Sequence, residues 1–215
     1  GKTPLIRYGL IHQDGYNVEL YIKMDTLNPS GSFKARGSEH NINEAINDGI
    51  IKPGDDIITA SAGNHAQGVA KAAAGHGLRA IIYMSMDAPK SKIEGTERLG
   101  GIVQLVNGDY HKADEEARAE AERTGIYYVP AYKDANVILG QSTIATEVMM
   151  QLREFRIRPD FFVSPLGGGG LANGIGYALN HFDENGMFIR ISSLSPVLKS
   201  MLSSTLFVVF REMGR

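Results

Sequence analysis

The chain has 215 residues, with 22 Lys and Arg against 24 Asp and Glu and a formal net charge of −2. This balance leaves no excess positive charge to attract a nucleic-acid backbone or an anionic membrane, so we expect neither as a partner. The hydrophobic fraction of 43% suffices for a packed core, and the absence of cysteine excludes disulfides and thiolate chemistry. No apolar run approaches the ~20 residues of a membrane helix, and the amino terminus lacks a secretory signal pattern. We therefore expect a soluble, cytoplasmic protein.

Short β-branched runs alternate with helical patterns along the chain. Strands are predicted over 18–24, 56–61, 80–86, 102–106, 126–129, 160–166 and 188–194. Helices are predicted over 34–47, 65–75, 91–99, 110–124, 141–155 and 171–180. The alternation predicts an α/β protein built on parallel sheets, whose ligands bind at the carboxyl ends of the strands. A turn-rich stretch over 52–56 indicates a passage between two lobes, and the apolar tail 206–210 has strand-like character.

The first candidate site is the segment 28–37, which places Lys34 at the start of a predicted helix, behind a turn and beside Phe33. A helix start is positively polarised, so a lysine there loses its proton more easily and attacks an aldehyde as a neutral amine. Taken alone, the segment fits an exposed, solvated lysine better.

The second candidate site is the segment 61–68, Ser-Ala-Gly-Asn-His-Ala-Gln-Gly, which follows a predicted strand and opens a helix. Its successive backbone N–H groups, together with the Ser61 hydroxyl, form a cradle for a carboxylate or phosphate. An N-cap at Asn64 and a surface histidine at His65 account for the same residues equally well.

The third candidate site is the run of four glycines over 167–170, between a predicted strand and a helix that begins near Leu171. Residues without side chains expose several N–H groups to one anion, and the helix dipole adds attraction, which suits a phosphate monoester. A flexible linker is the alternative, although linkers seldom join a buried strand directly to a helix. No Gly-Lys-Ser/Thr follows and the spacing is not G-x-G-x-x-G, so ATP and NAD are poor candidates.

In combination, these segments resemble the fold-type II pyridoxal-phosphate enzymes, specifically the threonine and serine dehydratases, also called threonine ammonia-lyases. The resemblance runs from Gly1 to about Ser195 and rests on Thr3-Pro4-Leu5, Pro29 to Gly37, Ser61 to Gly68, Gly140 to Ile144 and Gly167 to Leu171. It implies a tryptophan synthase β-like fold with two parallel-sheet, three-layer lobes. The larger, cofactor-binding domain is expected over 1–52 and 137–215, and a smaller mobile domain over 53–136.

The resemblance also implies a role for each segment. Lys34 is expected to bind pyridoxal 5'-phosphate as a Schiff base, with Phe33 packed beside the cofactor and Asn64 hydrogen-bonded to its 3-hydroxyl group. The cofactor phosphate is expected on Gly167, Gly168, Gly169, Gly170 and Leu171. The substrate carboxylate is expected on Ser61, Ala62, Gly63, Asn64 and His65. No metal site is expected.

The implied activity is the elimination of water from L-threonine or L-serine, which yields a 2-oxo acid and ammonia and is a step of isoleucine biosynthesis. Ala62 stands where serine racemases carry a serine that acts as acid and base on the opposite face of the cofactor. Its absence favours elimination, and a racemase-like activity is an alternative. A homodimer is expected by analogy alone.

The resemblance fails after about Ser195, and the chain stops at Arg215, short of the length expected of this family. We find no counterpart of the glycine-rich turn that faces the pyridine nitrogen in relatives. We therefore expect the cofactor domain to be truncated at its C-terminal end. A shortened relative that binds the cofactor without catalysis is a second hypothesis, and a chain too loose to bind the cofactor is a third.

Overall fold

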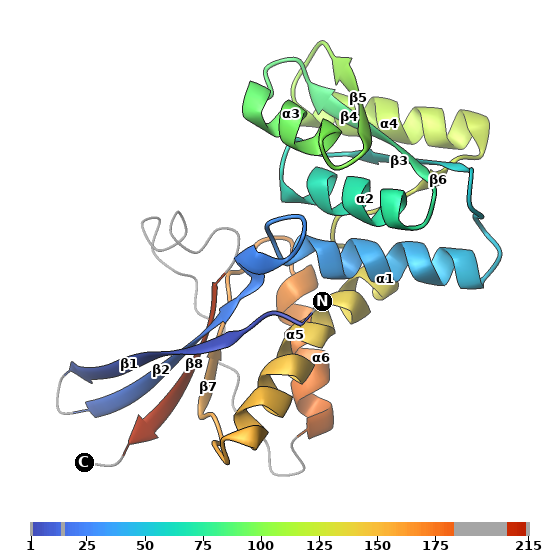
Figure 1. Cartoon of the computed structure of the whole chain (residues 1–215). Helices are drawn as coiled ribbons and strands as arrows, with labels where there is room; N and C mark the ends of the chain where they lie inside the picture. Colours follow the sequence, from blue (N-terminus) through green and yellow to red (C-terminus); the bar gives the residue numbers. More distant parts are fainter. Residues whose placement is uncertain (1, 14–15, 183–205, 214–215) are drawn as a thin grey trace. The chain divides into compact units, whose positions relative to one another are not determined.

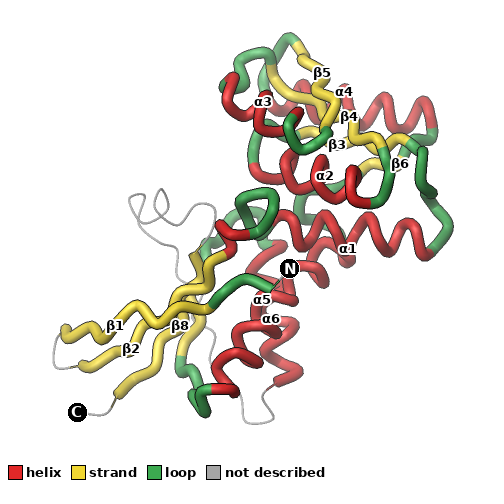
Figure 2. Tube along the Cα trace, viewed as in Figure 1, coloured by secondary structure: helices red, strands yellow, loops and turns green. Residues whose placement is uncertain are grey.

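The computed structural model describes residues 2–13, 16–182 and 206–213. They divide into two compact units, one formed by Gly1–Phe33 with Gln141–Arg215 and the other by Lys34–Gly140. Figure 1 and Figure 2 show the alternation of strands and helices that makes this an α/β protein, as the sequence predicts. Among the described residues, no helix combines the length and the apolar character that crossing a membrane requires.

The unit 34–140 is built on a parallel sheet with helices on both faces (Figure 1). Its strands follow the order β5 (Gly101–Val106), β4 (Arg79–Ser85), β3 (Asp56–Ala60) and β6 (Tyr127–Tyr128). Helices α2 (Asn64–Gly75) and α3 (Lys90–Glu97) cover one face, α4 (Tyr110–Thr124) covers the other, and α1 (Lys34–Asn47) packs on α2. All three strand pairs are parallel, which confirms the predicted parallel sheet in this unit.

The core of this unit follows from the pleat of β3 and β4. Ile57 and Ile82 are buried in the cluster with α1 and α2, whereas Ile58 packs with Ala117 of α4. Successive side chains of a strand point to opposite faces, and both faces are covered here. This is why 56–60 reads as a nearly continuous apolar run rather than an alternating one.

The other unit contains a four-stranded sheet in the order β1-β2-β8-β7. Its strands are β1 (Leu5–Gln13), β2 (Tyr16–Met24), β7 (Phe161–Val163) and β8 (Leu206–Met213). All its described pairs are antiparallel, which differs from the parallel sheet predicted for both lobes. For β1 and β2 the physical reason is the connection: only Asp14-Gly15 separates them in the sequence, and two residues join antiparallel neighbours but not parallel ones.

Helices α5 (Ala135–Glu154) and α6 (Gly170–Phe182) supply the apolar core of this unit. Phe162 of the sheet is buried in one cluster with Ile144 and Ile175 of the two helices. A short 3-10 helix, η1 (Asp25–Leu27), leads from β2 toward the lysine segment.

A buried lysine ties the N-terminal segment to α5. The Lys23 side chain is fully buried, and its Nζ donates hydrogen bonds to the Thr3 carbonyl oxygen at 2.6 Å and to Gln151 Oε1 at 2.8 Å. The Glu147 carboxylate lies 2.8 Å from the same nitrogen and balances its charge. A buried ammonium without partners is costly, and the Thr3 carbonyl oxygen is one of the partners of Lys23. The cluster therefore holds Thr3-Pro4-Leu5 in place.

The helix boundaries agree closely with the sequence, since the predicted helices over 34–47 and 110–124 are observed with the same ends. The main difference is α5, which starts at Ala135 instead of 141. Asp134 explains the earlier start, because its Oδ1 accepts a hydrogen bond from the Val137 N–H at 3.0 Å.

The predicted strand over 188–194 lies outside the described residues, whereas the strand-like tail forms β8. The predicted domain boundaries at 52/53 and 136/137 stay a prediction, because compactness alone does not identify the part that moves.

Candidate functional site

Lys34 is the first residue of α1, and its side chain is partly buried. Its Nζ donates a hydrogen bond to the carbonyl oxygen of Ala131 at 2.7 Å and lies 6.0 Å from the centre of the Tyr132 ring. Burial lowers the pKa of Lys34 from 10.5 to about 8, because the ammonium form loses hydration. Lys34 is therefore not the exposed, solvated lysine that the segment 28–37 favoured when taken alone. Near pH 7, a far larger fraction of its amine is neutral than in a solvated lysine.

The segment 61–68 lies at the carboxyl end of β3, where α2 begins at Asn64. The Gly63 N–H donates to Ser61 Oγ at 3.1 Å, so the hydroxyl orders the turn. The N-cap position is occupied by Gly63, not by Asn64, and no side chain caps the helix there. Within the described part of the chain, the Asn64 amide also makes no hydrogen bond. The first N–H groups of α2 and the Asn64 amide are therefore available to a ligand.

His65 is buried, in contrast to a surface histidine. Its Nε2 lies 3.1 Å from Thr59 Oγ1 and 3.3 Å from the Val129 carbonyl oxygen. Burial, and next the nearby Lys34 charge, lower the pKa of His65 to about 3, so the ring is neutral. His65 was predicted to bind the substrate carboxylate. Its ring instead lies within hydrogen-bonding distance of Thr59 and Val129 of the same unit.

Two glycines allow helices to approach the backbone around Lys34. A Cβ at Gly68 of α2 would lie 3.1 Å from the Lys34 carbonyl carbon and oxygen. A Cβ at Gly140 of α5 would lie 2.5 Å from the Arg36 carbonyl oxygen and 2.7 Å from Gly37 Cα. Larger residues would push these helices off α1, so both glycines serve to fix the start of α1.

The glycine run 167–170 connects β7 to α6. Gly169 has a φ of +87°, a conformation that favours glycine. Its carbonyl oxygen accepts the Asn173 N–H at 2.9 Å, which closes the first turn of α6. The N–H groups of Gly168 to Leu171 make no hydrogen bond with any other described residue. The loop is thus a set of unpaired donors at a helix start, which suits an anion.

The remaining predicted residues pack in or against the apolar cores. Phe33 is partly buried against the core that contains Ile144 and Leu171, and Leu171 itself is buried there. Ala62 is partly buried against the core of the unit 34–140. Within the ranges that the structure describes, no three His, Asp or Glu side chains are grouped to hold a metal ion.

Each unit by itself fits one part of pyridoxal phosphate. The Lys34 amine, with its lowered pKa, suits the aldehyde group, and the unpaired N–H groups of 168–171 suit the phosphate. The residues present therefore agree with the cofactor that the resemblance implies.

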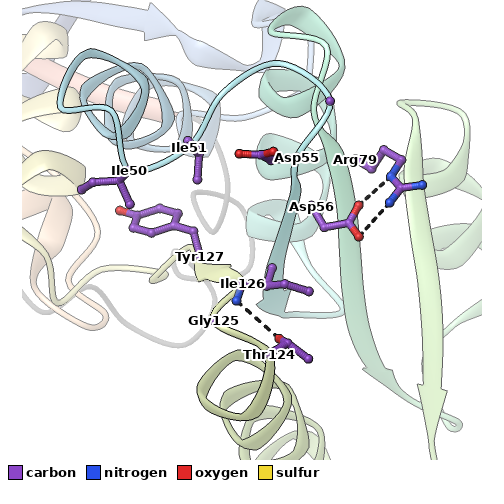
Figure 3. A pocket seen from close by; sticks show the side chains of 10 residues that line it. Ile50, Ile51, Asp55, Asp56, Arg79, Thr124, Gly125, Ile126 and Tyr127 are labelled. Atoms are coloured by element: carbon purple, nitrogen blue, oxygen red, sulfur yellow. Dashed lines mark hydrogen bonds and ion pairs between the residues drawn. The ribbon is translucent and has the colours of Figure 1, made fainter.

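A pocket of about 340 Å³ lies elsewhere in the unit 34–140 (Figure 3). Its lining includes the ion pair between Asp56 and Arg79, with Arg79 Nε 2.6 Å from Asp56 Oδ1. These residues begin β3 and β4, whereas Ser61 follows the opposite end of β3. Because ligands of parallel sheets bind at the carboxyl ends of the strands, this pocket is not part of the candidate site.

Sequence reasoning missed Ala131 and Tyr132, which lie next to the Lys34 amine. It also missed Thr59 and Val129, which lie within hydrogen-bonding distance of the His65 ring. Val129 and Ala131 act through their carbonyl oxygens, which every residue type possesses, so their side chains give no signal. Thr59 gave only a weak one, as a polar residue inside the apolar strand 56–61.

The family model described as "Pyridoxal-phosphate dependent enzyme" matches residues 1–206. The chain is 38% identical over 186 residues to an L-threonine ammonia-lyase of Thermotoga maritima and 33% identical to a serine racemase of Schizosaccharomyces pombe. The two alignments cover 86% of this chain but 44% and 54% of the relatives. An L-threonine dehydratase of Haemophilus influenzae, named as biosynthetic, is 32% identical over 93% of this chain and 38% of its own length.

Solved structures give the same likeness. The processed form of threonine deaminase isoform 2 from Solanum lycopersicum superposes with a TM-score of 0.71 and 36% identity over 79% of this chain and 47% of its own. Maize serine racemase superposes with a TM-score of 0.74 and 27% identity over 88% of this chain and 55% of its own. The chain therefore spans about half the length of the relatives that it matches.

Proposed function

Because the chain belongs to the family of pyridoxal-phosphate dependent enzymes, we propose that it binds the cofactor through Lys34 and eliminates water from L-threonine or L-serine, releasing a 2-oxo acid and ammonia. One observation carries the proposal: a partly buried lysine at a helix start, with a pKa lowered to about 8. Threonine ammonia-lyases and dehydratases among the relatives support the choice of reaction.

Lys34 has two tasks in this reaction. When bound, pyridoxal phosphate supplies a ring that withdraws electrons from the α-carbon of an attached amino acid. The neutral Lys34 amine would hold the cofactor at its aldehyde group, and Nζ would accept the α-proton of the substrate. A pKa near 8 suits both tasks, because the amine is readily neutral yet still basic enough to take up a proton.

The turn before α2 supplies the donors for substrate and cofactor. The N–H groups at the start of α2, with the turn 61–63, are proposed to hold the substrate carboxylate, since an anion is favoured at a helix start. The Asn64 amide is proposed to donate to the cofactor's 3-hydroxyl oxygen, and residues 167–171 to hold its phosphate. These groups orient the substrate so that its α-proton faces a single base.

Ala62 supports elimination over racemisation. Racemisation requires a proton donor on the face opposite Lys34, and the methyl side chain of Ala62 carries none at the position where the resemblance places a serine in racemases. The His65 ring does not replace it, because its pKa of about 3 leaves it neutral and weakly basic. A proton leaving from one face without return from the other favours loss of the β-hydroxyl.

The test is the formation of 2-oxobutyrate from L-threonine and of pyruvate from L-serine by the purified chain with pyridoxal phosphate. A Lys34→Ala variant is the matched control. Product that requires Lys34 supports the proposal. Cofactor absorbance that requires Lys34 without any product refutes elimination and leaves cofactor binding, and formation of D-serine assigns the chain to racemisation instead.

We also propose a homodimer, by family analogy alone, together with a cytoplasmic location, a mobile smaller domain over 53–136 and a place in isoleucine biosynthesis. The name of the Haemophilus relative supports the last of these. Sedimentation of the purified chain tests the dimer.

A further inference from the structure

Three hydrogen-bonding groups meet at one point in the unit 34–140. Thr59 Oγ1 donates to the Val129 carbonyl oxygen at 2.8 Å, and His65 Nε2 lies 3.1 Å from Thr59 Oγ1. The Thr59 and His65 side chains are almost wholly buried, at 1% and 4% exposed. The cluster thus joins β3, the first turn of α2 and the chain that leaves β6.

The hydrogen-bond chemistry fixes the proton on the His65 ring. A threonine hydroxyl has one proton, and Thr59 donates it to Val129, so Oγ1 must accept from its other neighbour. His65 therefore carries its single ring proton on Nε2 and donates it to Thr59, with the Val129 oxygen also within 3.3 Å. Nε2 is therefore a donor in this cluster, and the pKa of about 3 keeps the ring neutral.

Both backbone polar groups of Val129 are hydrogen-bonded. Its N–H donates to the Ile58 carbonyl oxygen at 2.8 Å, and its own oxygen receives the Thr59 hydroxyl. Pro130 follows with a fixed φ, and a residue before proline is restricted to extended backbone. Only this short, stiff stretch separates Val129 from Ala131, whose carbonyl oxygen accepts the Lys34 amine at 2.7 Å.

We propose that Thr59 and His65 are positioning residues, which fix Val129 and thereby place the Ala131 carbonyl that holds the Lys34 amine for attack on the cofactor aldehyde. The inference rests on the proposed function of Lys34 as the cofactor lysine. It adds a role for a buried threonine that carries no motif, and it assigns the His65 ring to the support of Lys34 instead of to the substrate.

The test measures how fast the cofactor-free chain captures pyridoxal phosphate, followed by the visible absorbance that a Lys34→Ala variant lacks, as a function of pH. Thr59→Val removes the hydroxyl at nearly constant volume, and Thr59→Ser keeps the hydroxyl but removes the methyl group. Thr96→Val is the matched control, because Thr96 is also fully buried and donates to a carbonyl oxygen, that of Lys92, on α3.

A positioning role predicts that Thr59→Val lowers the plateau rate of capture roughly tenfold, since small misplacements of a reacting group are costly. The pH of half-maximal rate should stay near 8, because the burial of Lys34 is unchanged. Thr59→Ser should capture at close to the wild-type rate. Thr96→Val should match the wild type. A packing role predicts the reverse order, with serine worse than valine.

Capture by Thr59→Val at the wild-type rate, or a displaced half-maximal pH with an unchanged plateau, would overturn the inference. Absence of Lys34-dependent capture in the wild type would overturn the proposed function as well, so the two failures differ. If Thr59→Val does not fold by circular dichroism, His65→Gln is compared with His65→Met. The glutamine amide keeps a donor toward Thr59, so equal capture by both would refute the role of the ring.

Discussion

The Nζ atom of Lys34 lies 2.7 Å from the carbonyl oxygen of Ala131, a residue 97 positions later in the chain. Two effects act on the amine at this point. The carbonyl favours the ammonium form, because a charged donor makes the stronger hydrogen bond, whereas burial opposes it. The pKa of about 8 indicates that burial prevails, and it gives Lys34 the balance of basicity and availability that a cofactor lysine requires.

The pH dependence of cofactor capture follows from this pKa. The neutral amine is the reactive form, so the rate should rise as pH increases through about 8 and level off above it. An ordinary solvated lysine would still be gaining rate near pH 10. Stopped-flow absorbance between pH 6 and 10 provides the measurement, and a rate that continues to climb beyond pH 9.5 would contradict the buried environment of Lys34.

Acid stability should depend on His65. Its folded-state pKa of about 3 lies below the unfolded value of 6.5, so the unfolded chain binds the extra proton first and stability falls as pH drops below 6.5. At pH 5 this loss amounts to about 2 kcal/mol. The His65→Gln variant has no group to protonate there. Between pH 7 and pH 5 its free energy of unfolding should fall by about 2 kcal/mol less than that of the wild type. Urea unfolding of both proteins at the two pH values tests this, and equal losses would contradict a buried neutral ring.

The close packing at Gly140 can be tested by comparing its alanine variant with that of Gly75, a glycine of α2 with open space around it. Gly140→Ala places a methyl group 2.5 Å from the Arg36 carbonyl oxygen, so we expect a loss of about 1–3 kcal/mol from overpacking. Gly75→Ala meets nothing within 4 Å at the end of α2 and should leave stability equal or raise it by up to about 1 kcal/mol. Thermal unfolding of the two variants should rank them in this order, and an unaffected Gly140→Ala would show that α5 has room to move from α1.

The glycine run offers a second matched pair. Gly169 has a φ of +87°, and an L side chain there costs about 1–2 kcal/mol. At Gly167 an added methyl group would meet nothing within 4 Å, and the backbone has no positive φ. Gly169→Ala should therefore destabilise the chain, and Gly167→Ala should not. Denaturant unfolding without cofactor compares them, and equal stability would argue against the left-handed turn before α6.

The sequence predicted those parts of the molecule in which side-chain pattern decides the structure. Helix α1 appears with its predicted ends, since good helix formers follow the turn before Lys34. The parallel order of β3 and β4 follows from apolar strands separated by helices. The glycines at 68 and 140 were found through the family resemblance, although their purpose, close approach to the backbone of α1, appears only in three dimensions.

Other features of the structure were not predicted from the sequence. The strand β1 was not predicted, although Asp14-Gly15 is a typical two-residue hairpin signal. The pairing of β2 with β8 joins segments far apart in the chain, which no local pattern specifies. Likewise, the burial of His65 depends on Thr59 and Val129, whose backbone and side-chain positions are set by the sheet.

Reductive trapping shows whether Lys34 carries the cofactor. The purified chain is incubated with pyridoxal phosphate, reduced with borohydride and digested, and each lysine-containing peptide is examined by mass spectrometry. We predict that the pyridoxyl-phosphate mass is found on Lys34 and is lost in Lys34→Ala. Modification spread evenly over the surface lysines, with Lys34 unlabelled, would rule out Lys34 as the lysine that binds the cofactor.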